Sequence, residues 1–134
     1  MPSSKKKPVI LYAEDDYDDF ESVKEALQQL SADCELVHAR HGEQALEYLR
    51  DHEADLPSLV VLDLNMPIMD GKEVLQSMKR DDRYKNIPVM IFTTSSREDD
   101  VKLCQKHDCT FFRKPTLYRD LLHIGQVMMQ MSES

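Results

Sequence analysis

The sequence predicts an α/β fold in which five parallel strands form a doubly wound sheet with five helices on its two faces. Short apolar runs alternate along the chain with longer segments whose apolar residues recur at helical spacing. Two of the runs, 59–62 (LVVL) and 89–92 (VMIF), are apolar throughout, which is typical of central parallel strands buried on both faces. At 134 residues, the chain suits one compact domain.

The expected elements alternate between strand and helix from one end of the chain to the other. Such alternation builds right-handed βαβ units and therefore a parallel sheet covered on both faces. The strands are expected at 9–13, 35–39, 59–62, 89–92 and 110–112. The first helix is expected around Phe20, Val23, Leu27 and Leu30, the second at 44–50, and the third after Gly71, with Val74, Leu75 and Met78. The fourth is expected around Val101, Leu103 and Cys104, and the fifth at 117–131.

The charge balance of the chain is acidic. The sequence holds 17 Lys and Arg against 25 Asp and Glu, which gives a formal net charge of −8. The basic residues are interspersed with acidic ones, and this argues against nucleic-acid binding, which needs clustered Lys and Arg. No apolar run approaches the roughly 20 residues of a membrane helix, and the polar start of the chain does not resemble a signal peptide. We therefore expect a cytoplasmic domain over residues 8–131, preceded by a basic tail at 1–7.

The other residues with ligand chemistry have plain interpretations. The three cysteines follow no CxxC spacing, so we expect reduced and mostly buried thiols. The five histidines are scattered and are expected at surface or boundary positions rather than as ligands. Methionines near the C-terminus suit core packing, and a contact between two copies of the chain in a homodimer is an alternative role for them. The residues concerned are Cys34, Cys104, Cys109, His38, His41, His52, His107, His123, Met128, Met129 and Met131.

Polar side chains stand at the ends of four expected strands. The acidic run 14–16 (EDD) follows the first strand, and Asp63 follows the third. Thr93 comes at the end of the fourth strand, and Lys114 comes shortly after the fifth. Ligands of a doubly wound sheet bind at the carboxyl ends of its strands, so these groups should meet at one edge. Each of these residues could instead have a purely structural role, as a helix cap, a turn residue or a surface lysine. Such residues at the ends of four strands by chance are far less expected than at one.

The chemistry of this edge favours a metal ion and a phosphoryl group. Carboxylates held together repel one another by about 4 kcal/mol per pair at ~4 Å with an effective dielectric near 20, so a cation has to neutralise them. Oxygen ligands without His or Cys favour Mg²⁺. Thr93 and Lys114 offer donors for phosphoryl oxygens, and the Asp63 carboxylate can form an acyl phosphate.

Four stretches resemble the receiver domains of response regulators in two-component signalling. They are 10–16 (ILYAEDD), 62–71 (LDLNMPIMDG), 87–93 (IPVMIFT) and Lys114-Pro115, and the similarity runs from about residue 8 to residue 131. The resemblance implies a flavodoxin-like fold with strand order 2-1-3-4-5, dependence on Mg²⁺, and phosphotransfer from a sensor histidine kinase or a histidine phosphotransfer protein. It implies a signalling domain that assists its own phosphorylation and dephosphorylation, and not an enzyme with a separate substrate.

The resemblance also implies roles at the metal site. Asp63 matches the phosphoacceptor, and Asp15 matches the acid that contacts the metal directly. Glu14 matches the preceding acid, which acts through a metal-bound water, and the backbone carbonyl of Asn65 would complete the protein ligands. Glu14 stands where Asp is commoner, and its arm, longer by one methylene, leaves the water-mediated role feasible.

Three further residues match the parts of the family that respond to phosphorylation. Thr93 matches the switch hydroxyl, Lys114 the phosphate-binding lysine and Phe111 the rotating aromatic switch. Phe111 lacks the hydroxyl of a tyrosine, so its switching should depend on ring burial alone. Thr94 stands where many members carry a small residue, and we expect its bulk to slow the loss of the phosphoryl group.

The resemblance indicates a stand-alone regulator that acts by protein contact. We expect no appended output domain after the last helix, and we expect a downstream protein to bind the face made by the fourth helix, fifth strand and fifth helix. The stretch 78–87 (MKRDDRYKNI) and the polar loop 93–96 (TTSS) are similar to those of regulators paired with phytochrome-type histidine kinases.

Two other functions remain open at this point. A pseudo-receiver would keep the fold and bind partners without taking phosphate, although the complete set of acids, Thr and Lys argues against it. The loop 63–65 (DLN) also resembles the nucleophile loop of haloacid-dehalogenase-type phosphatases, in which a second acid does acid–base work. Asn65 fills that position and cannot do so, and the chain is short for a segment that caps a substrate.

Overall fold

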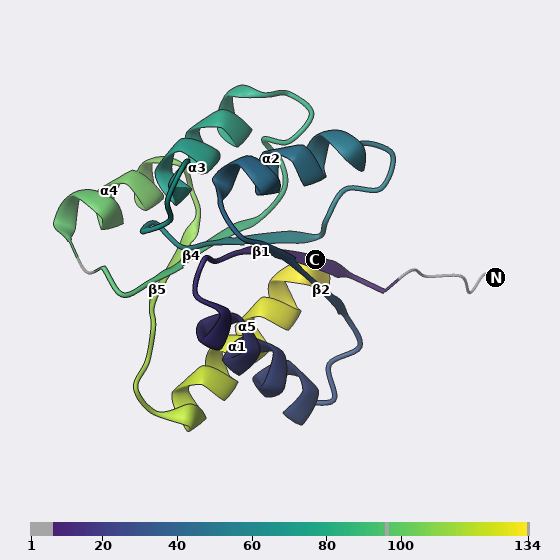
Figure 1. Ribbon diagram of the computed structural model, residues 1–134, viewed down its shortest axis with the longest axis vertical. Helices are drawn as coiled ribbons and strands as arrows, with labels where there is room; N and C mark the ends of the chain where they lie inside the picture. The colour runs from purple at the N-terminus through teal and green to yellow at the C-terminus, as the bar shows by residue number, and fades with distance from the viewer. Residues whose placement is uncertain (1–6, 96, 134) are drawn as a thin grey trace.

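Five parallel strands form one sheet in the order β2-β1-β3-β4-β5, as Figure 1 shows for the computed structural model. The strands are β1 (Val9–Ala13), β2 (Glu35–Ala39), β3 (Leu59–Leu62), β4 (Val89–Thr93) and β5 (Thr110–Arg113). The fold class and the strand order implied by the sequence are confirmed. The structure describes residues 7–95 and 97–133, so the expected basic tail lies, except for its last residue, outside the described residues.

Helices cover both faces of the sheet (Figure 1). The first and last helices, α1 (Tyr17–Gln29) and α5 (Tyr118–Glu133), lie together on one face. The other face is covered by α2 (Gly42–Asp51), α3 (Gly71–Arg80) and α4 (Glu98–Lys106). The sequence predicts all five helices, and the ends that it predicts differ by a residue or two because local caps decide where a helix stops. None of the described helices is long and apolar enough to cross a membrane.

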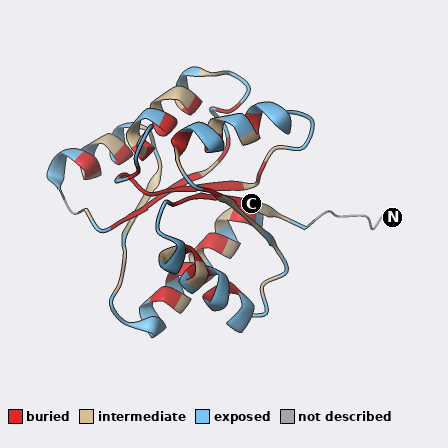
Figure 2. Cartoon of the chain, viewed as in Figure 1, coloured by how far each residue is buried: buried red, intermediate tan, exposed pale blue. Residues whose placement is uncertain are grey.

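The pleat of β1 divides its side chains between two hydrophobic cores. Leu11 and Ala13 pack with residues of α2, α3 and α4, whereas Ile10 and Tyr12 pack with residues of α1 and α5. Every residue of β3 and β4 is buried, and Figure 2 shows the middle of the sheet as a buried layer between the helices. A strand buried on both faces has no solvent side, which explains why the sequences of β3 and β4 carry almost no polar residues.

The acidic run after β1 divides between helix capping and the sheet edge. Asp16 is the N-cap of α1, and its carboxylate accepts hydrogen bonds from the backbone N–H groups of Asp18 at 2.9 Å and Asp19 at 3.2 Å. Capping of this kind satisfies donors that would otherwise have no partner inside the helix. The alternative interpretation of the run, as a helix cap, is therefore right for Asp16. Only Glu14 and Asp15 remain as acids at the sheet edge.

The prediction of three reduced thiols is wrong for two of the cysteines. Cys104 near the end of α4 and Cys109 just before β5 form a disulfide, with their Cα atoms 5.2 Å apart. The chain reverses between them at Asp108, whose φ is 56°, and the N–H of Cys109 donates to the carbonyl of Cys104 at 3.0 Å. This turn brings together two residues whose spacing in the sequence carries no disulfide signal. Cys34 is a free, half-buried thiol.

The first residue of α3, Gly71, lies against the backbone of Asp63. A Cβ at this position would lie 2.3 Å from the carbonyl oxygen of Asp63. Because the obstacle is backbone rather than the end of a flexible side chain, the helix could accept a larger residue only by moving away from β3. Glycine therefore sets how closely α3 approaches the carboxyl end of the sheet.

We expect Gly71→Ala to lower the free energy of unfolding by about 1–3 kcal/mol, as measured by urea denaturation. Gly125→Ala in α5 is the matched control, because a Cβ there would meet the side-chain ends of Leu30 at 3.0 Å and Leu27 at 3.7 Å. Alanine also favours a helix interior over glycine by about 1 kcal/mol, so this variant should stay close to the wild-type stability. Equal losses in the two variants would contradict the close approach of α3.

Candidate functional site

The hydrogen-bond ladder of the sheet continues into the residues that follow its strands. The backbone N–H of Asp63 donates to the carbonyl of Ala13 at 3.1 Å, and that of Lys114 donates to the carbonyl of Thr93 at 2.8 Å. These residues are therefore still in register with the neighbouring strands where their side chains leave the sheet. The structure brings the residues expected from the sequence to this one edge, namely Glu14, Asp15, Asp63, Asn65, Thr93 and Lys114.

The Lys114 ammonium is shared by three carboxylates. Its Nζ lies 2.7 Å from Oε1 of Glu14, 2.7 Å from Oδ2 of Asp19 and 2.8 Å from Oδ2 of Asp63. Burial opposes the charged form of the lysine, but hydrogen bonds to the three carboxylates outweigh it and raise the pKa of Lys114. The edge of the sheet thus holds one permanent positive charge.

Donors surround both oxygens of the Asp63 carboxylate. Oδ1 accepts from the Thr93 hydroxyl at 2.9 Å and from the backbone N–H of Asn65 at 3.1 Å, while Oδ2 accepts from Lys114 at 2.8 Å. Burial opposes ionisation of Asp63, but hydrogen bonds with Glu14, Lys114 and the Asn65 N–H lower its pKa below the ordinary value. Asp63 is therefore a buried, ionised carboxylate held in one orientation.

Glu14 is the acid of this group that favours a proton. Its side chain is fully buried, and burial together with a hydrogen bond to Asp63 raises the pKa of Glu14 to about 7, against the opposing effect of Lys114. The hydroxyl of Tyr12 donates to Oε1 of Glu14 at 2.8 Å. A proton on Glu14 removes the repulsion between two carboxylates in contact, so Glu14 holds the proton and Asp63 stays ionised.

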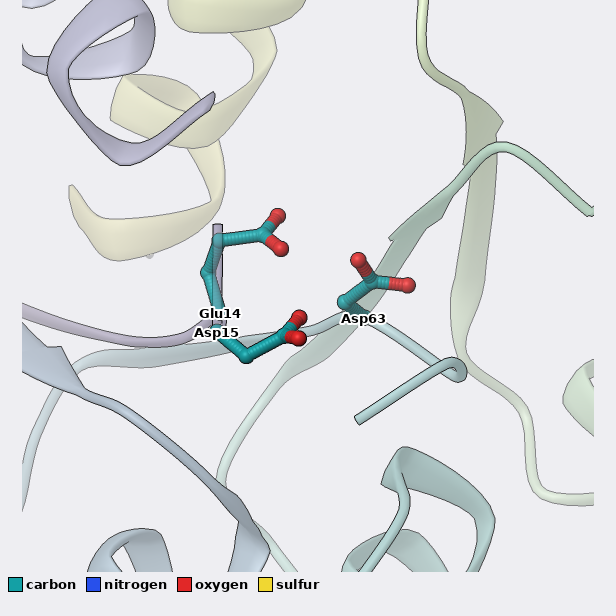
Figure 3. Close-up of side chains that lie close together, drawn as sticks. All are labelled: Glu14, Asp15 and Asp63. Atoms are coloured by element: carbon teal, nitrogen blue, oxygen red, sulfur yellow. The ribbon is translucent and has the colours of Figure 1, made fainter. Parts of the chain in front are cut away.

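Three carboxylates converge in the space between the ends of β1 and β3 (Figure 3). One oxygen from each of Glu14, Asp15 and Asp63 lies within 4.8 Å of the others, and we call these three residues the acidic cluster. Asp15 is its exposed member, whereas Glu14 and Asp63 are buried. A set of oxygen donors that is open to solvent on one side suits a hard cation that keeps several waters, as Mg²⁺ does. The acidic cluster therefore fits the metal that the sequence implies.

The loop after β3 is held by a strained turn and by the start of α2. Ile68 has a φ of 69°, where a β-branched residue is an outlier, and the N–H of Met69 donates to the carbonyl of Pro67 at 2.8 Å. The N–H of Gly42 donates to the carbonyl of Met69 at 3.0 Å, and a Cβ at Gly42 would lie 2.3 Å from that oxygen. Helix α2 thereby fixes the loop in which Asn65 lies.

The Thr93 hydroxyl connects the site to α3 and α4. Its oxygen accepts hydrogen bonds from Nδ2 of Asn65 at 3.4 Å and from the N–H of Ser95 at 3.3 Å. The Ser95 hydroxyl donates to Asp100 at 2.7 Å, and the buried Asp100 carboxylate forms an ion pair with Lys72 at 3.1 Å. A continuous series of polar contacts therefore runs from the sheet edge to the start of both helices.

The expected aromatic switch, Phe111, is half-buried in β5. Its register partner on β4 is Ile91, two residues before Thr93, and both Phe111 and Ile91 contribute to the core under α2, α3 and α4. Because alternate residues of a strand share one face, the ring lies on the same side of the sheet as the Thr93 side chain. This position suits a ring that responds to movement of Thr93.

Three residues at the site are missing from the candidates that the sequence indicates. Tyr12 could have been found, because it lies two residues before Glu14 and therefore on the same face of β1. Asp19 looks in the sequence like an ordinary acid in the first turn of a helix. His38 is expected at a boundary position, but its Nε2 lies 2.6 Å from the backbone carbonyl oxygen of Glu14. Only the register of β1 with β2 reveals that contact.

The family described as the response regulator receiver domain matches residues 10–124, a span that contains every site residue described above. The chain belongs to the response-regulator receiver family. The probable methanogenesis regulatory protein FilR2 of Methanothrix harundinacea is 37% identical over 117 residues, which cover 84% of this chain and 76% of that protein. The response regulator Rcp1 of Synechocystis sp. is 41% identical over 97 residues, which cover 69% of this chain and 66% of that protein.

Solved structures of receivers agree with this assignment over nearly the whole chain. The phosphorylated cyanobacterial phytochrome response regulator RcpA superposes with a TM-score of 0.85 at 32% identity, covering 96% of both chains. The Mn²⁺-bound form of response regulator Rcp1 gives a TM-score of 0.80 at 36% identity, covering 90% of this chain and 91% of that chain. This receiver therefore shares its architecture with regulators that are known in phosphorylated and metal-bound forms.

The raised pKa of Glu14 predicts how the stability of the metal-free receiver depends on pH. The folded protein has a pKa of about 7 at this carboxyl, against 4.5 as the ordinary value. Between these values the folded state binds a proton that the unfolded state has lost, so stability from this group is present at low pH and is lost as the pH rises through about 7. We expect the wild type to lose at most about 3 kcal/mol of unfolding free energy from this group between about pH 5 and about pH 8.

The measurement is urea unfolding in the presence of a chelator, with Glu14→Gln as the matched variant. Glutamine does not titrate, so the difference between the two proteins isolates the contribution of Glu14. The Asp63 carboxyl does not interfere, because its lowered pKa puts its titration below this window. Wild-type and Glu14→Gln stabilities that change in parallel with pH would show that Glu14 is ionised throughout.

Proposed function

We propose that this receiver works as a response regulator that accepts a phosphoryl group on Asp63. The donor would be a phosphohistidine of a sensor histidine kinase or of a histidine phosphotransfer protein. The observation that carries the proposal is the set of donors around Asp63, in which Lys114, Thr93 and the backbone N–H of Asn65 all contact its carboxylate. A buried carboxylate that stays ionised is a ready nucleophile, and the same donors suit phosphoryl oxygens.

The transfer uses groups of the chain in defined roles. An oxygen of the Asp63 carboxylate attacks the phosphorus, the bond from phosphorus to the imidazole nitrogen breaks, and its electron pair stays on that nitrogen. The Lys114 ammonium, 2.8 Å from Asp63, would neutralise a phosphoryl oxygen, and the Thr93 hydroxyl would donate to another. Bound Mg²⁺ would stabilise the charge on the phosphoryl oxygens during transfer. Orientation of Asp63 by its donors would reduce the entropic cost of the reaction.

The acidic cluster is the proposed Mg²⁺ site. Asp15, Asp63 and the backbone carbonyl of Asn65 would bind the ion directly, and Glu14 would bind it through a water. Support comes from the convergence of the three carboxylates and from the Mn²⁺-bound structure of Rcp1, a related receiver. Mg²⁺ prefers oxygen ligands and retains waters, which agrees with a cluster that has one exposed acid.

The proposed output is a change in a protein-binding surface. Thr93 would follow the phosphoryl group, and Phe111 and the contacts of Ser95 would carry the change to α4, β5 and α5 as a shift between two states. A downstream protein would bind that surface in the cytoplasm. A kinase of the phytochrome type is the proposed partner, on the strength of the similarity to RcpA, a cyanobacterial phytochrome response regulator.

Intact mass spectrometry after incubation with acetyl phosphate tests the acceptance of phosphate. We expect the wild type to gain one phosphoryl group when Mg²⁺ is present and none when a chelator replaces it. Asp63→Asn is the control, because an amide keeps the shape of the carboxylate but cannot act as the nucleophile. A gain in the Asp63→Asn variant would contradict the assignment of the acceptor.

The same experiment separates the proposal from its rivals. A folded wild type that gains no phosphoryl group from acetyl phosphate or from phytochrome-type kinases would favour a pseudo-receiver that binds its partners unmodified. Steady hydrolysis of phosphate esters, with many turnovers per protein, would favour a phosphatase. Retention of a single phosphoryl group, followed by slow loss, is the outcome that supports a signalling domain.

Thr94 is expected to protect the phosphorylated receiver from water. It is exposed and directly follows Thr93 at the end of β4, so its side chain would lie beside the phosphoryl group. We expect Thr94→Ala to lose phosphate faster than the wild type, because a smaller side chain admits water more easily. Thr94→Val, which keeps the bulk, should decay at the wild-type rate, and the decay is followed by intact mass after removal of the donor. Unchanged or slower decay in Thr94→Ala would remove this role.

A further inference from the structure

His38 of β2 holds the backbone of the residue at which the acidic cluster begins. Its Nε2 lies 2.6 Å from the backbone carbonyl oxygen of Glu14. Because a carbonyl oxygen can only accept, the ring nitrogen must carry the proton and donate it. This contact joins two elements that lie 24 positions apart in the sequence.

Residues of β2 therefore bind the peptide groups on both sides of Glu14, through its N–H and through its carbonyl. The N–H of Glu14 donates to the carbonyl of Ala39 at 2.9 Å, and its carbonyl accepts from His38. The second of these groups belongs to the peptide bond that links Glu14 to Asp15. Since this peptide is planar, holding its oxygen also limits the direction in which the Asp15 side chain leaves the backbone.

The His38 ring is itself held in place by aromatic packing. It stacks on Phe20 of α1, with ring centroids 3.9 Å apart and planes at 9°. Phe20 is buried and also contacts the ring of Tyr12, at 5.9 Å between centroids, and Tyr12 holds the carboxylate of Glu14. The packed rings of His38, Phe20 and Tyr12 thus hold both the backbone and the side chain of Glu14.

We propose that His38 is a positioning residue for the metal site, because its hydrogen bond to the Glu14 carbonyl orients the peptide from which Asp15 projects. The inference rests on the proposed function, in which the acidic cluster binds Mg²⁺. His38 itself does not bind the metal, and its contribution is to hold Asp15 in the orientation that the ion needs. Partners of this kind, which orient a metal ligand without touching the metal, typically change metal affinity by about 10–100-fold when they are lost.

The test is the dissociation constant for Mn²⁺, measured by electron paramagnetic resonance of the free ion. His38→Phe keeps a flat ring on Phe20 but removes the donor, and we expect it to weaken Mn²⁺ binding by about 10-fold or more. His38→Gln replaces the ring by an amide that can donate, so affinity should return toward the wild-type value. His52→Phe is the matched control, because His52 also bonds to a backbone carbonyl at 2.8 Å and stacks on Tyr48 at 3.9 Å, but on α2.

Thermal unfolding of each variant separates positioning from a structural role. A structural residue would lower the unfolding temperature of both His38→Phe and His38→Gln without changing the affinity of the folded protein for Mn²⁺. If His38→Phe does not fold, His38→Met takes its place, because methionine is nearly the size of glutamine but has no N–H. Affinity equal to the wild type in a folded variant without the donor overturns the role of His38.

The result for the wild type shows which proposal has failed. Wild-type protein that binds no Mn²⁺ would overturn the proposed metal site, and the role of His38 would fall with it. Wild-type binding that is unchanged in the variants without the donor would overturn the role of His38 alone. Equal losses in His38→Phe and His52→Phe would also overturn it, because the effect would not depend on contact with Glu14.

Discussion

The site depends on the charge of Lys114, which is surrounded by more acid than it can neutralise. Glu14, Asp19 and Asp63 each contact its ammonium, and these acids come from the ends of β1 and β3 and from α1. The contacts form only if β5 brings Lys114 to the same level as the other strand ends. A half-buried charge that lies among three carboxylates is stabilised by those partners, so the strand register and the ionisation of the site support each other.

The excess of acid also explains why Glu14 and Asp63 differ in protonation. Asp63 accepts from Lys114, Thr93 and the Asn65 N–H, and these bonds hold its pKa low. Glu14 accepts from Tyr12, Lys114 and, at 3.3 Å, the Asp16 N–H, but it is fully buried, and burial is the largest effect on its pKa, which it raises. The proton therefore favours Glu14, and the ionised carboxylate stays on Asp63, which is the proposed nucleophile. The longer arm of Glu14 lets its carboxylate reach both Tyr12 and Lys114, which links this departure from the commoner Asp to the local charge balance.

The sequence could predict the parts of the receiver that depend on local pattern, but not those that depend on register. The apolar runs of β3 and β4 predict the layered sheet, and residues such as Asp63 and Lys114 are recognisable because strand ends meet at one edge. His38 and Asp19 have no such position, since their contacts depend on how β2 pairs with β1 and on the direction in which α1 leaves the sheet. The pairing of Cys104 with Cys109 likewise depends on a turn that composition does not reveal.

The single proton of the Thr93 hydroxyl limits how the site can respond to a change at Asp63. The hydroxyl now donates to Asp63 and accepts, over longer distances, from Asn65 and Ser95. Phosphorylation would turn the ionised Asp63 carboxylate into an uncharged acyl group and would offer this proton an anionic phosphoryl oxygen instead. A hydrogen bond to a charged group contributes about 1.5–3 kcal/mol against about 0.5–1.5 kcal/mol for a neutral one. Movement of Thr93 toward that oxygen would leave the N–H of Ser95 without its acceptor, and Ser95 is bound to Asp100 at the start of α4. The charge that attracts the Thr93 proton would therefore move from the carboxylate to the phosphoryl group, and the preferred arrangement of Thr93 would change with it.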